Sequence, residues 1–246
     1  MALVTGASRR RGIGAAAALA LAEGGWDVAT TYWRAYDQRM PWGSQADDVP
    51  ALDRQLRLYG AATASIEADL ADPTAPARIF DTVEATLGGI TALVLAHCES
   101  VASSILDTSV DSFDRHFAVN ARATWLLVRE FARRFVGEHG RGRIVSLTSD
   151  HVAGNHPYGA SKGAMDRIVL AAARELGHLG ITANAINPGA TDTDWMTPEQ
   201  LRVFAHSVPL GRVSTPDDCA NLVRFLCSRE GGWVNGQLLH SNGGVQ

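Results

Sequence analysis

Tyr158 and Lys162 stand four residues apart in the stretch Tyr-Gly-Ala-Ser-Lys, and their side-chain types could do acid–base chemistry. On a helix this spacing places both side chains on one face, one turn apart. A phenol with an ordinary pKa of about 10 is a poor proton donor or acceptor at neutral pH, but a neighbouring ammonium group lowers that pKa. Ser149, at the end of an apolar run, adds a hydroxyl that could hold a carbonyl. Taken alone, such a pair is more often a solvated helix pair.

A glycine-rich turn, Thr5–Gly14, lies near the start of the chain and reads Thr-Gly-Ala-Ser-Arg-Arg-Arg-Gly-Ile-Gly. It follows a short apolar run and precedes an alanine-rich helical stretch. In this context glycines let the backbone approach a pyrophosphate, and the exposed N–H groups at the start of the helix favour the anion. The turn therefore predicts dinucleotide binding, with a simple tight strand-to-helix connection as the alternative.

The choice between NAD and NADP is commonly set at the end of the second strand, where an acidic side chain binds the ribose of NAD. This chain has Tyr32 in that region and no acid before Asp37. Arg9, Arg10 and Arg11 lie in the glycine turn, and guanidinium groups suit a 2′-phosphate. We expect NADP(H) rather than NAD(H), with three solvated arginines as the alternative.

Short apolar runs alternate with longer helical patterns along the whole chain, which is typical of a doubly wound parallel sheet. The predicted strands are Ala2–Thr5, Trp26–Tyr32, Ala64–Glu67, Ala92–Ala96, Arg143–Thr148, Ile181–Asn187 and Gln237–His240. The predicted helices include Gly14–Glu23, Ala75–Leu87, Ser112–Val136 and Tyr158–Leu179. We expect one α/β Rossmann domain over residues 1–246, with a seven-stranded parallel sheet flanked by helices. The irregular stretch Trp33–Val49 is predicted to be a long surface loop.

Composition excludes several other classes of protein. The 246 residues carry a net charge of −4, so nothing favours a nucleic-acid or membrane partner. Three widely spaced cysteines form neither a disulfide framework nor a metal-ligand set, and no metal site is expected. Met1 is followed directly by an apolar strand with no signal peptide, so we expect a cytoplasmic protein.

Beyond these local patterns, the chain resembles the short-chain dehydrogenase/reductase family over nearly its whole length. The matching segments are the glycine turn, Asp69-Leu70, Asn120, Ser149, Tyr158–Lys162, Asn187-Pro-Gly-Ala-Thr-Asp-Thr193, Gly211-Arg212, Pro216-Asp217-Asp218, Phe225-Leu226 and Gly236–Gly244. Within the family it looks most like the carrier-protein-type β-ketoacyl reductases. The resemblance implies a Rossmann fold, interconversion of a ketone and a secondary alcohol with a nicotinamide cofactor, and a homotetramer or homodimer.

The resemblance also implies roles for individual residues. Tyr158 would exchange the proton with the carbonyl or alcohol oxygen, Ser149 would orient that oxygen, Lys162 would lower the Tyr158 pKa, and Asn120 would hold a water that relays protons to Lys162. Together with the glycine turn, it assigns cofactor binding to Gly6, Ser8, Arg9, Gly12, Ile13, Gly14, Tyr32, Asp69, Leu70, Ala96, Asn120, Tyr158, Lys162, Pro188, Gly189, Thr191 and Thr193. The substrate would be a small carbonyl or alcohol compound.

Three features depart from the family pattern. The glycine turn has five residues between Gly6 and Gly12, two more than usual. Leu95–Cys98 replaces the usual Asn-Asn-Ala-Gly segment, and its His97 is either substrate-facing or, as we expect, structural. Ser149 lies only nine residues before Tyr158, so the Asp150–Pro157 loop is short and could widen the pocket or displace Ser149. The loops Glu99–Leu106, Asp150–Pro157 and Asp194–Pro209 are expected to line the substrate pocket.

Two other functions fit parts of the sequence. Gly159-Ala-Ser161-Lys-Gly163 matches the G-x-S-x-G element of hydrolases, but that element requires a strand leading into it, and none can be drawn there. A dinucleotide-binding sensor or scaffold without catalysis is the second alternative, since fold alone does not settle function. The retained Ser149, Tyr158, Lys162 and Asn120 favour an enzyme over a sensor.

Overall fold

A single sheet of seven parallel strands runs through the molecule in the order β3-β2-β1-β4-β5-β6-β7. The computed structural model describes residues 1–245. The strands are β1 (Ala2–Thr5), β2 (Val28–Tyr32), β3 (Thr63–Glu67), β4 (Ala92–Leu95), β5 (Gly142–Leu147), β6 (Ile181–Asn187) and β7 (Leu238–His240). All seven predicted strands are present with slightly shifted ends, so the predicted Rossmann sheet is confirmed. The strand order changes direction between β1 and β4, and ligands of such sheets bind beyond the carboxyl ends of the strands at that point.

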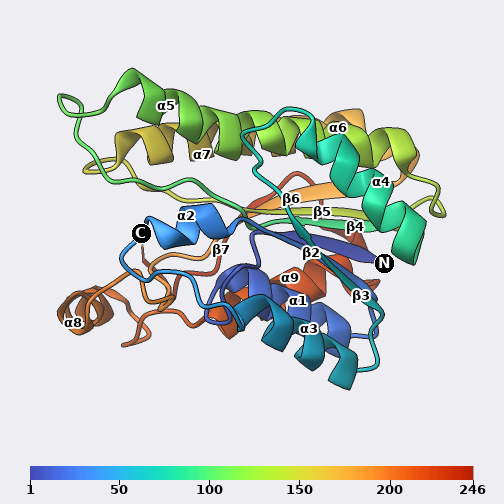
Figure 1. The fold of residues 1–246 in the computed structure, drawn as a ribbon, viewed down its shortest axis with the longest axis horizontal. Helices are drawn as coiled ribbons and strands as arrows, with labels where there is room; N and C mark the ends of the chain where they lie inside the picture. The colour runs from blue at the N-terminus through green and yellow to red at the C-terminus, as the bar shows by residue number, and fades with distance from the viewer. Residues whose placement is uncertain (246) are drawn as a thin grey trace.

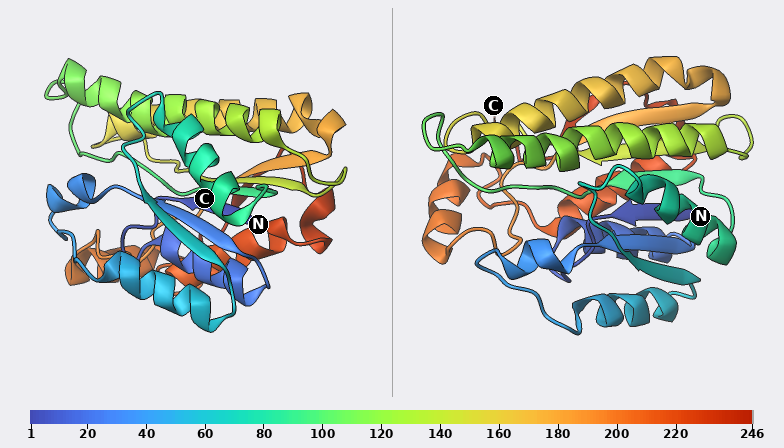
Figure 2. Two further views of the ribbon diagram at one scale, coloured as in Figure 1. Left: turned by 45° about the vertical axis from the view of Figure 1, so that its right-hand side comes forward. Right: turned by 45° about the horizontal axis from the view of Figure 1, so that its top comes forward.

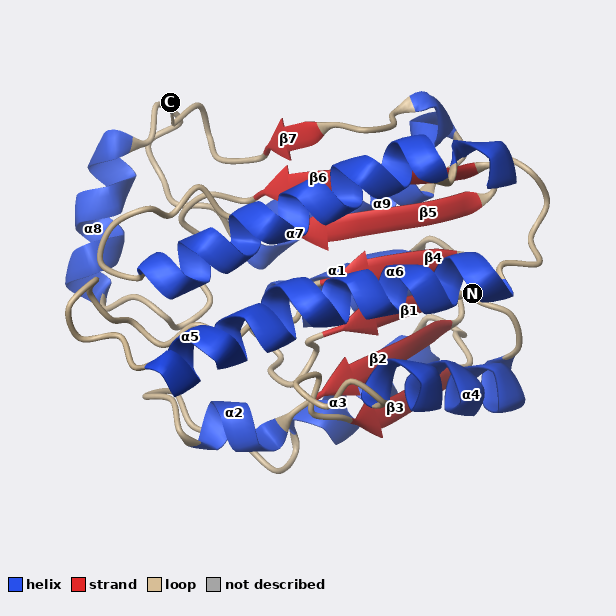
Figure 3. Ribbon diagram, turned by 90° about the horizontal axis from the view of Figure 1, so that it is seen from above, coloured by secondary structure: helices blue, strands red, loops and turns tan. Residues whose placement is uncertain are grey.

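Helices cover both faces of the sheet (Figure 1). One layer contains α1 (Ile13–Glu23), α3 (Asp48–Leu58) and α9 (Pro216–Cys227), and the other contains α4 (Ala75–Leu87), α5 (Val110–His116), α6 (Ala123–Arg134) and α7 (His156–Glu175). Each layer buries its own apolar core against the sheet, which explains why the central strands lack polar alternation. The short helices α2 (Arg34–Gln38) and α8 (Pro198–Ser207) lie at the end toward which the strand arrows point (Figures 2 and 3).

The predicted helix Ser112–Val136 is two helices joined by a wider turn. Helix α5 ends at His116, a π-type turn occupies Phe117–Arg122, and α6 follows without a break. Such turns insert an extra residue into a helix and are frequent at functional sites. Asn120 lies in this turn and is fully buried. The turn therefore places one of the predicted site residues.

The prediction of a surface loop at Trp33–Val49 is wrong in two respects. The stretch contains α2 and the first residues of α3, and Asp37 within it is only 2% exposed. Asp37 is buried because its carboxylate pairs with Arg9 at 3.4 Å and accepts a hydrogen bond from Trp42 Nε1 at 2.9 Å. Contacts of polar side chains thus hold this segment against the rest of the protein. Apolar periodicity, the pattern used to predict helices and strands, does not reveal such contacts.

None of the helices in residues 1–245 combines the length and apolar character that a membrane span requires. In the same residues, no group of three or more His, Cys, Asp or Glu side chains is placed to hold a metal ion.

Candidate active site

One cavity of about 740 Å³ extends along the carboxyl ends of the strands. All the predicted catalytic and cofactor-binding residues line it, with the exception of Asn120, which lies behind the wall. The three loops predicted to border the substrate also contribute, through residues such as Ser100, His151 and Trp195. Its volume is within the range usual for ligand pockets. The chain therefore gathers residues far apart in sequence around one cavity.

Tyr158 and Lys162 lie on the first turns of α7, as their spacing predicts. The Lys162 ammonium is 5.7 Å from the centre of the Tyr158 ring. Its Nζ donates a hydrogen bond of 2.7 Å to the carbonyl oxygen of Leu147, the last residue of β5. Lys162 is 2% exposed, so this bond fixes a buried charge against the end of the central strand. Ser149, two residues further along, lines the same cavity.

The Tyr158 phenol does not have the lowered pKa expected from the sequence. Burial raises its pKa well above the ordinary value, the neighbouring Cys98 adds to this effect, and a hydrogen bond with Ser149 offsets part of it. Burial also lowers the pKa of Lys162, although the Cys98 and Asp166 groups oppose that change. The raised pKa keeps the phenol protonated at neutral pH but makes it a weaker acid, so burial opposes the lowering expected from the Lys162 ammonium.

Asn120 supports Tyr158 indirectly. Its Nδ2 donates a hydrogen bond of 2.8 Å to Ser161 Oγ, and the Ser161 hydroxyl donates one of 2.8 Å to the Tyr158 carbonyl oxygen. Ser161 lies within α7 and is fully buried, and its hydroxyl both accepts and donates a hydrogen bond inside the protein. The hydrolase alternative is excluded, because the serine of the Gly159–Gly163 pattern sits within a helix rather than on a strand-to-helix turn.

His97, in the unusual Leu95–Cys98 segment, has a structural role. Its Nε2 lies 3.1 Å from the Val119 carbonyl oxygen, and its Nδ1 lies 2.7 Å from Thr5 Oγ1. Burial, assisted by the charge of Lys162, lowers the pKa of His97 to about 3, so the ring is neutral. A neutral ring that faces a carbonyl carries its proton on Nε2 and accepts the Thr5 hydroxyl at Nδ1. The ring ties β1 and β4 to the π-type turn.

The short loop between Ser149 and Tyr158 is folded tightly onto the start of α7. A Cβ atom at Gly159 would lie 1.9 Å from the His151 carbonyl oxygen, so only glycine permits this contact. The His151 ring lies edge-on to the Tyr158 ring, with centres 6.3 Å apart. Ser149 Oγ accepts a hydrogen bond of 3.1 Å from the His151 N–H, and Ser149 lines the same cavity as Tyr158.

The glycine turn has the geometry of an anion site. Gly6 has φ +75°, and a Cβ on it would lie 2.6 Å from the His97 backbone. A Cβ on Gly14 would lie 2.4 Å from the Gly6 carbonyl oxygen, so both positions require glycine. Helix α1 begins at Ile13 with no side-chain cap, which leaves N–H groups at its start for a ligand.

Each arginine of the turn contacts a carboxylate on a neighbouring segment. Arg9 pairs with Asp37 and donates a hydrogen bond of 2.8 Å to the Thr193 carbonyl oxygen. Arg10 pairs with Asp48 at 3.1 Å, and Arg11 pairs with Asp192 at 3.3 Å and Asp194 at 2.8 Å. The arginines therefore join the turn to the segments on both sides of it, with Arg9 largely buried at 14% exposed and Arg10 and Arg11 still 56% and 62% exposed.

The 33–47 segment forms part of the cavity wall that the sequence did not reveal. Trp42 stacks on Trp195 with ring centres 5.3 Å apart and planes 6° apart, and the Arg9 guanidinium lies 4.5 Å from the Trp42 ring centre. This three-layer stack joins the glycine turn, the 33–47 segment and the segment after β6 across the cavity. Its aromatic residues and Met40 were the available signal, since a solvated loop needs few apolar side chains.

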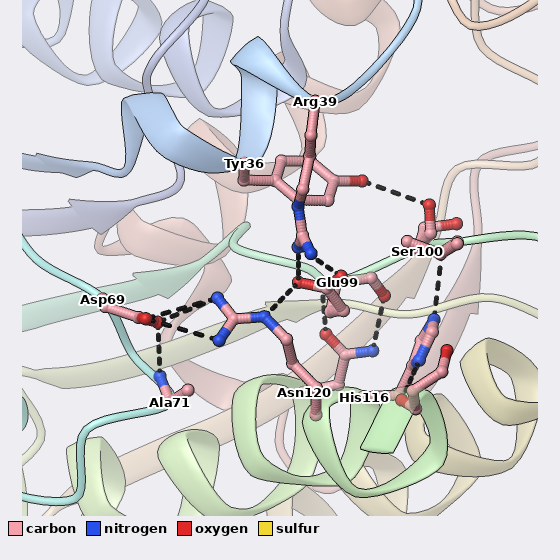
Figure 4. A network of polar contacts seen from close by, with 11 residues as sticks. Tyr36, Arg39, Asp69, Ala71, Glu99, Ser100, His116 and Asn120 are labelled. Carbon is pink, nitrogen blue, oxygen red and sulfur yellow. Dashed lines mark hydrogen bonds and ion pairs between the residues drawn. The ribbon is translucent and has the colours of Figure 1, made fainter. Parts of the chain in front are cut away.

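Asp69, predicted to bind the cofactor, is held by Arg115 of α5. The guanidinium donates to both carboxylate oxygens over 3.2 to 3.4 Å, and the Ala71 N–H donates to Asp69 Oδ1 at 2.9 Å (Figure 4). Arg115 also contacts Glu99, which is nearly buried. Asp69 is therefore part of a polar network that reaches from β3 to the segment after β4.

A nicotinamide dinucleotide fits these residues. The glycine turn and the uncapped start of α1 would hold its diphosphate, and Lys162 and the segment after β6 would hold its nicotinamide end. Asn187 Nδ2 is buried against this segment with no partner among the described residues, and Asn187 lines the cavity. An unsatisfied buried donor of this kind is costly and so indicates a ligand.

The fold and the cavity together define a single-domain, dinucleotide-binding α/β enzyme of the doubly wound type. The family model described as enoyl-(acyl carrier protein) reductase matches residues 6–246. An uncharacterized oxidoreductase of Bacillus subtilis is 35% identical, with 99% of this chain and 96% of the relative covered. An NADPH-dependent aldehyde reductase-like chloroplastic protein of Arabidopsis thaliana is 34% identical, with 99% and 93% covered.

Among solved structures, a short-chain dehydrogenase of Burkholderia cenocepacia in complex with NADP is 36% identical to this chain. The comparison covers 99% of this chain and 96% of that one, with a TM-score of 0.88. The chain therefore belongs to the short-chain dehydrogenase/reductase family, a family of oxidoreductases. The resemblance seen in the sequence is confirmed at the level of the family.

Proposed function

We propose that this protein is an NADPH-dependent reductase that converts a ketone to a secondary alcohol, or the reverse. The observation that carries the proposal is the placement of Tyr158, Ser149 and Lys162 in the same cavity as the glycine turn. A proton donor and an anion-binding helix start at two ends of one cavity are what hydride transfer to a carbonyl requires.

The chain's own residues supply the proton and the orientation. When bound, the reduced nicotinamide supplies the hydride to the carbonyl carbon. The Ser149 hydroxyl donates a hydrogen bond to the carbonyl oxygen, and the Tyr158 phenol gives that oxygen its proton. The Lys162 ammonium favours the phenolate that remains, because a positive charge nearby stabilises it. Asn120 fixes the backbone of Tyr158 through Ser161.

Three observations support NADPH over NADH. Strand β2 ends at Tyr32 without a carboxylate. Arg34 lies two residues further on, and its Nε is buried with no partner among residues 1–245. The Burkholderia cenocepacia relative is a complex with NADP. We propose that Arg34 contacts the 2′-phosphate, because the arginines of the glycine turn are engaged by carboxylates.

The substrate end of the cavity favours an apolar ketone. Met40, Met196 and Phe204 line it beside the stacked Trp42 and Trp195. Burial of an apolar substrate against such a wall contributes about 25 cal/mol for each Å² removed from water. The likeness to carrier-protein-type β-ketoacyl reductases makes acyl chains with a 3-keto group the first compounds to test.

A panel of apolar, cyclic and 3-ketoacyl carbonyl compounds, followed at the nicotinamide absorbance with NADPH and with NADH, tests the function. We expect turnover of at least one compound, with kcat/KM at least about tenfold higher for NADPH, a ratio equivalent to about 1.4 kcal/mol. NADPH binding without any turnover would favour the sensor alternative. A preference for NADH would contradict the role of Arg34.

We also propose assembly into a homotetramer or homodimer through α5, α6 and α7. Val110 and Phe113 on α5 and Trp125 on α6 are 74%, 37% and 48% exposed, so these two helices present several large apolar side chains. Light scattering of the protein and of Trp125→Glu would measure the assembly, and a wild-type monomer would contradict it.

A further inference from the structure

Glu99 is a nearly buried carboxylate between the two ends of the cavity. Its side chain is 3% exposed, and it accepts hydrogen bonds from Arg39, which follows α2, and from Arg115 of α5 (Figure 4). A buried carboxylate is costly unless it is paired and hydrogen-bonded, and each of the two arginines supplies such a partner. The pairing joins the 33–47 segment to α5 through one side chain.

The backbone of Glu99 holds Asn120 from both sides. The Glu99 N–H donates a hydrogen bond of 2.7 Å to Asn120 Oδ1, and Asn120 Nδ2 donates one of 2.9 Å to the Glu99 carbonyl oxygen. Asn120 contacts Ser161, which contacts the Tyr158 backbone. A shift of Glu99 is therefore transmitted to the proton donor through two side chains.

The carboxylate of Glu99 reaches the opposite end of the cavity as well. Arg115 donates to Glu99 through Nε at 3.2 Å and to Asp69 through its terminal nitrogens. Arg39 holds α2, whose Tyr36 hydroxyl donates to the Ser100 carbonyl oxygen at 3.4 Å. Arg115 thus links Glu99 to the predicted cofactor residue Asp69. Arg39 links Glu99 to the segment that carries Trp42.

We propose that Glu99 is a positioning residue that sets the 33–47 segment, Asp69 and Asn120 in register around the cavity. Glu99 also lines the cavity, but this role is exercised through Asn120, Arg39 and Arg115, and the inference rests on the proposed reductase function. The two arginines that contact Glu99 affect different steps. Arg115 governs cofactor affinity through Asp69, and Arg39 governs the substrate end through the 33–47 segment.

The test compares Glu99→Gln, Arg115→Met and Arg39→Met with Arg134→Met as the matched control. Arg134 also bridges several carboxylates, Asp81, Glu84 and Glu130, but between α4 and α6 and away from the cavity. For each protein we would measure thermal stability, NADPH affinity by fluorescence, and kcat and KM for the best carbonyl compound of the panel.

We expect Glu99→Gln to lower kcat about 10- to 100-fold, because small misplacement of reacting groups has effects of this size. Arg115→Met should weaken NADPH binding about fivefold with kcat retained. Arg39→Met should raise the KM of the carbonyl compound with NADPH affinity retained, and Arg39→Lys should restore part of it. Arg134→Met should lower stability alone.

Equal losses of stability in all four variants, without this split between kcat, KM and NADPH affinity, would overturn the proposal. If the wild-type protein reduces no carbonyl compound, the proposed function fails. The affinities still decide the inference in that case, since unchanged NADPH binding in Arg115→Met would contradict it.

Discussion

The two ends of the cavity are built from different kinds of structure. Tyr158 and Lys162 stand on α7, a helix of 20 residues, and Lys162 is bonded to the end of β5. The wall at the substrate end is formed by connecting segments, which Arg9, Trp42 and Trp195 hold together by an ion pair and stacking. Bonds within and between regular elements set the first wall, whereas the second depends on contacts between segments far apart in sequence, including the buried pair of Arg9 and Asp37. The comparison separates a wall that local sequence patterns specify from one that long-range contacts specify.

The largest expected effect comes from removing the proton donor. Tyr158→Phe should lower kcat for carbonyl reduction about 10²- to 10⁴-fold, the usual contribution of general acid catalysis. NADPH affinity should stay within about twofold, because the ring is retained. Steady-state kinetics and a fluorescence titration measure the two quantities. Full turnover in this variant would show that Tyr158 is not the proton donor.

A smaller effect is expected from disturbing the loop on α7. Gly159→Ala would place a Cβ 1.9 Å from the His151 carbonyl oxygen, so the loop must shift. We expect kcat to fall about 10-fold or more and stability to fall by about 1–3 kcal/mol, as in other overpacked sites. Gly163→Ala is the control, because nothing lies within 4 Å of its Cβ, and it should be neutral or stabilising. Equal behaviour of the two variants would contradict the close packing.

The smallest effect is expected from disturbing the stack of Arg9, Trp42 and Trp195 in the cavity wall. Trp42→Ala removes the middle layer of the stack, and an aromatic pair of this kind is worth about 0.5–1.5 kcal/mol. We expect the KM of the carbonyl compound to rise about 2- to 10-fold in steady-state kinetics, with NADPH affinity within about twofold in a fluorescence titration. Trp233→Ala is a suitable control, since Trp233 is 98% exposed and lies outside the cavity wall. An unchanged KM would show that the stack does not shape the substrate end.

The same difference explains what the sequence could predict. Strands, the glycine turn and the Tyr158–Lys162 face follow from local periodicity and spacing, and the structure has them where the sequence placed them. The π-type turn at Asn120 and the inward fold of the 33–47 segment depend on partners distant in sequence, such as Glu99 for Asn120 and Arg9 for Asp37. Local patterns carry no record of such pairs. The direction in which the Tyr158 pKa shifts also depends on burial, which the spacing of Tyr158 and Lys162 does not reveal.

The central claim is that this cavity transfers a hydride from NADPH and a proton from Tyr158 to one carbonyl group. The most direct measurement follows deuterium from NADPH labelled at C4, on each face in turn, into the product of the best carbonyl compound of the panel. The account predicts deuterium on the carbinol carbon from one labelled face in the wild-type protein, and a rate reduced at least about 100-fold in Tyr158→Phe. NADPH consumption without deuterium in the alcohol would contradict it.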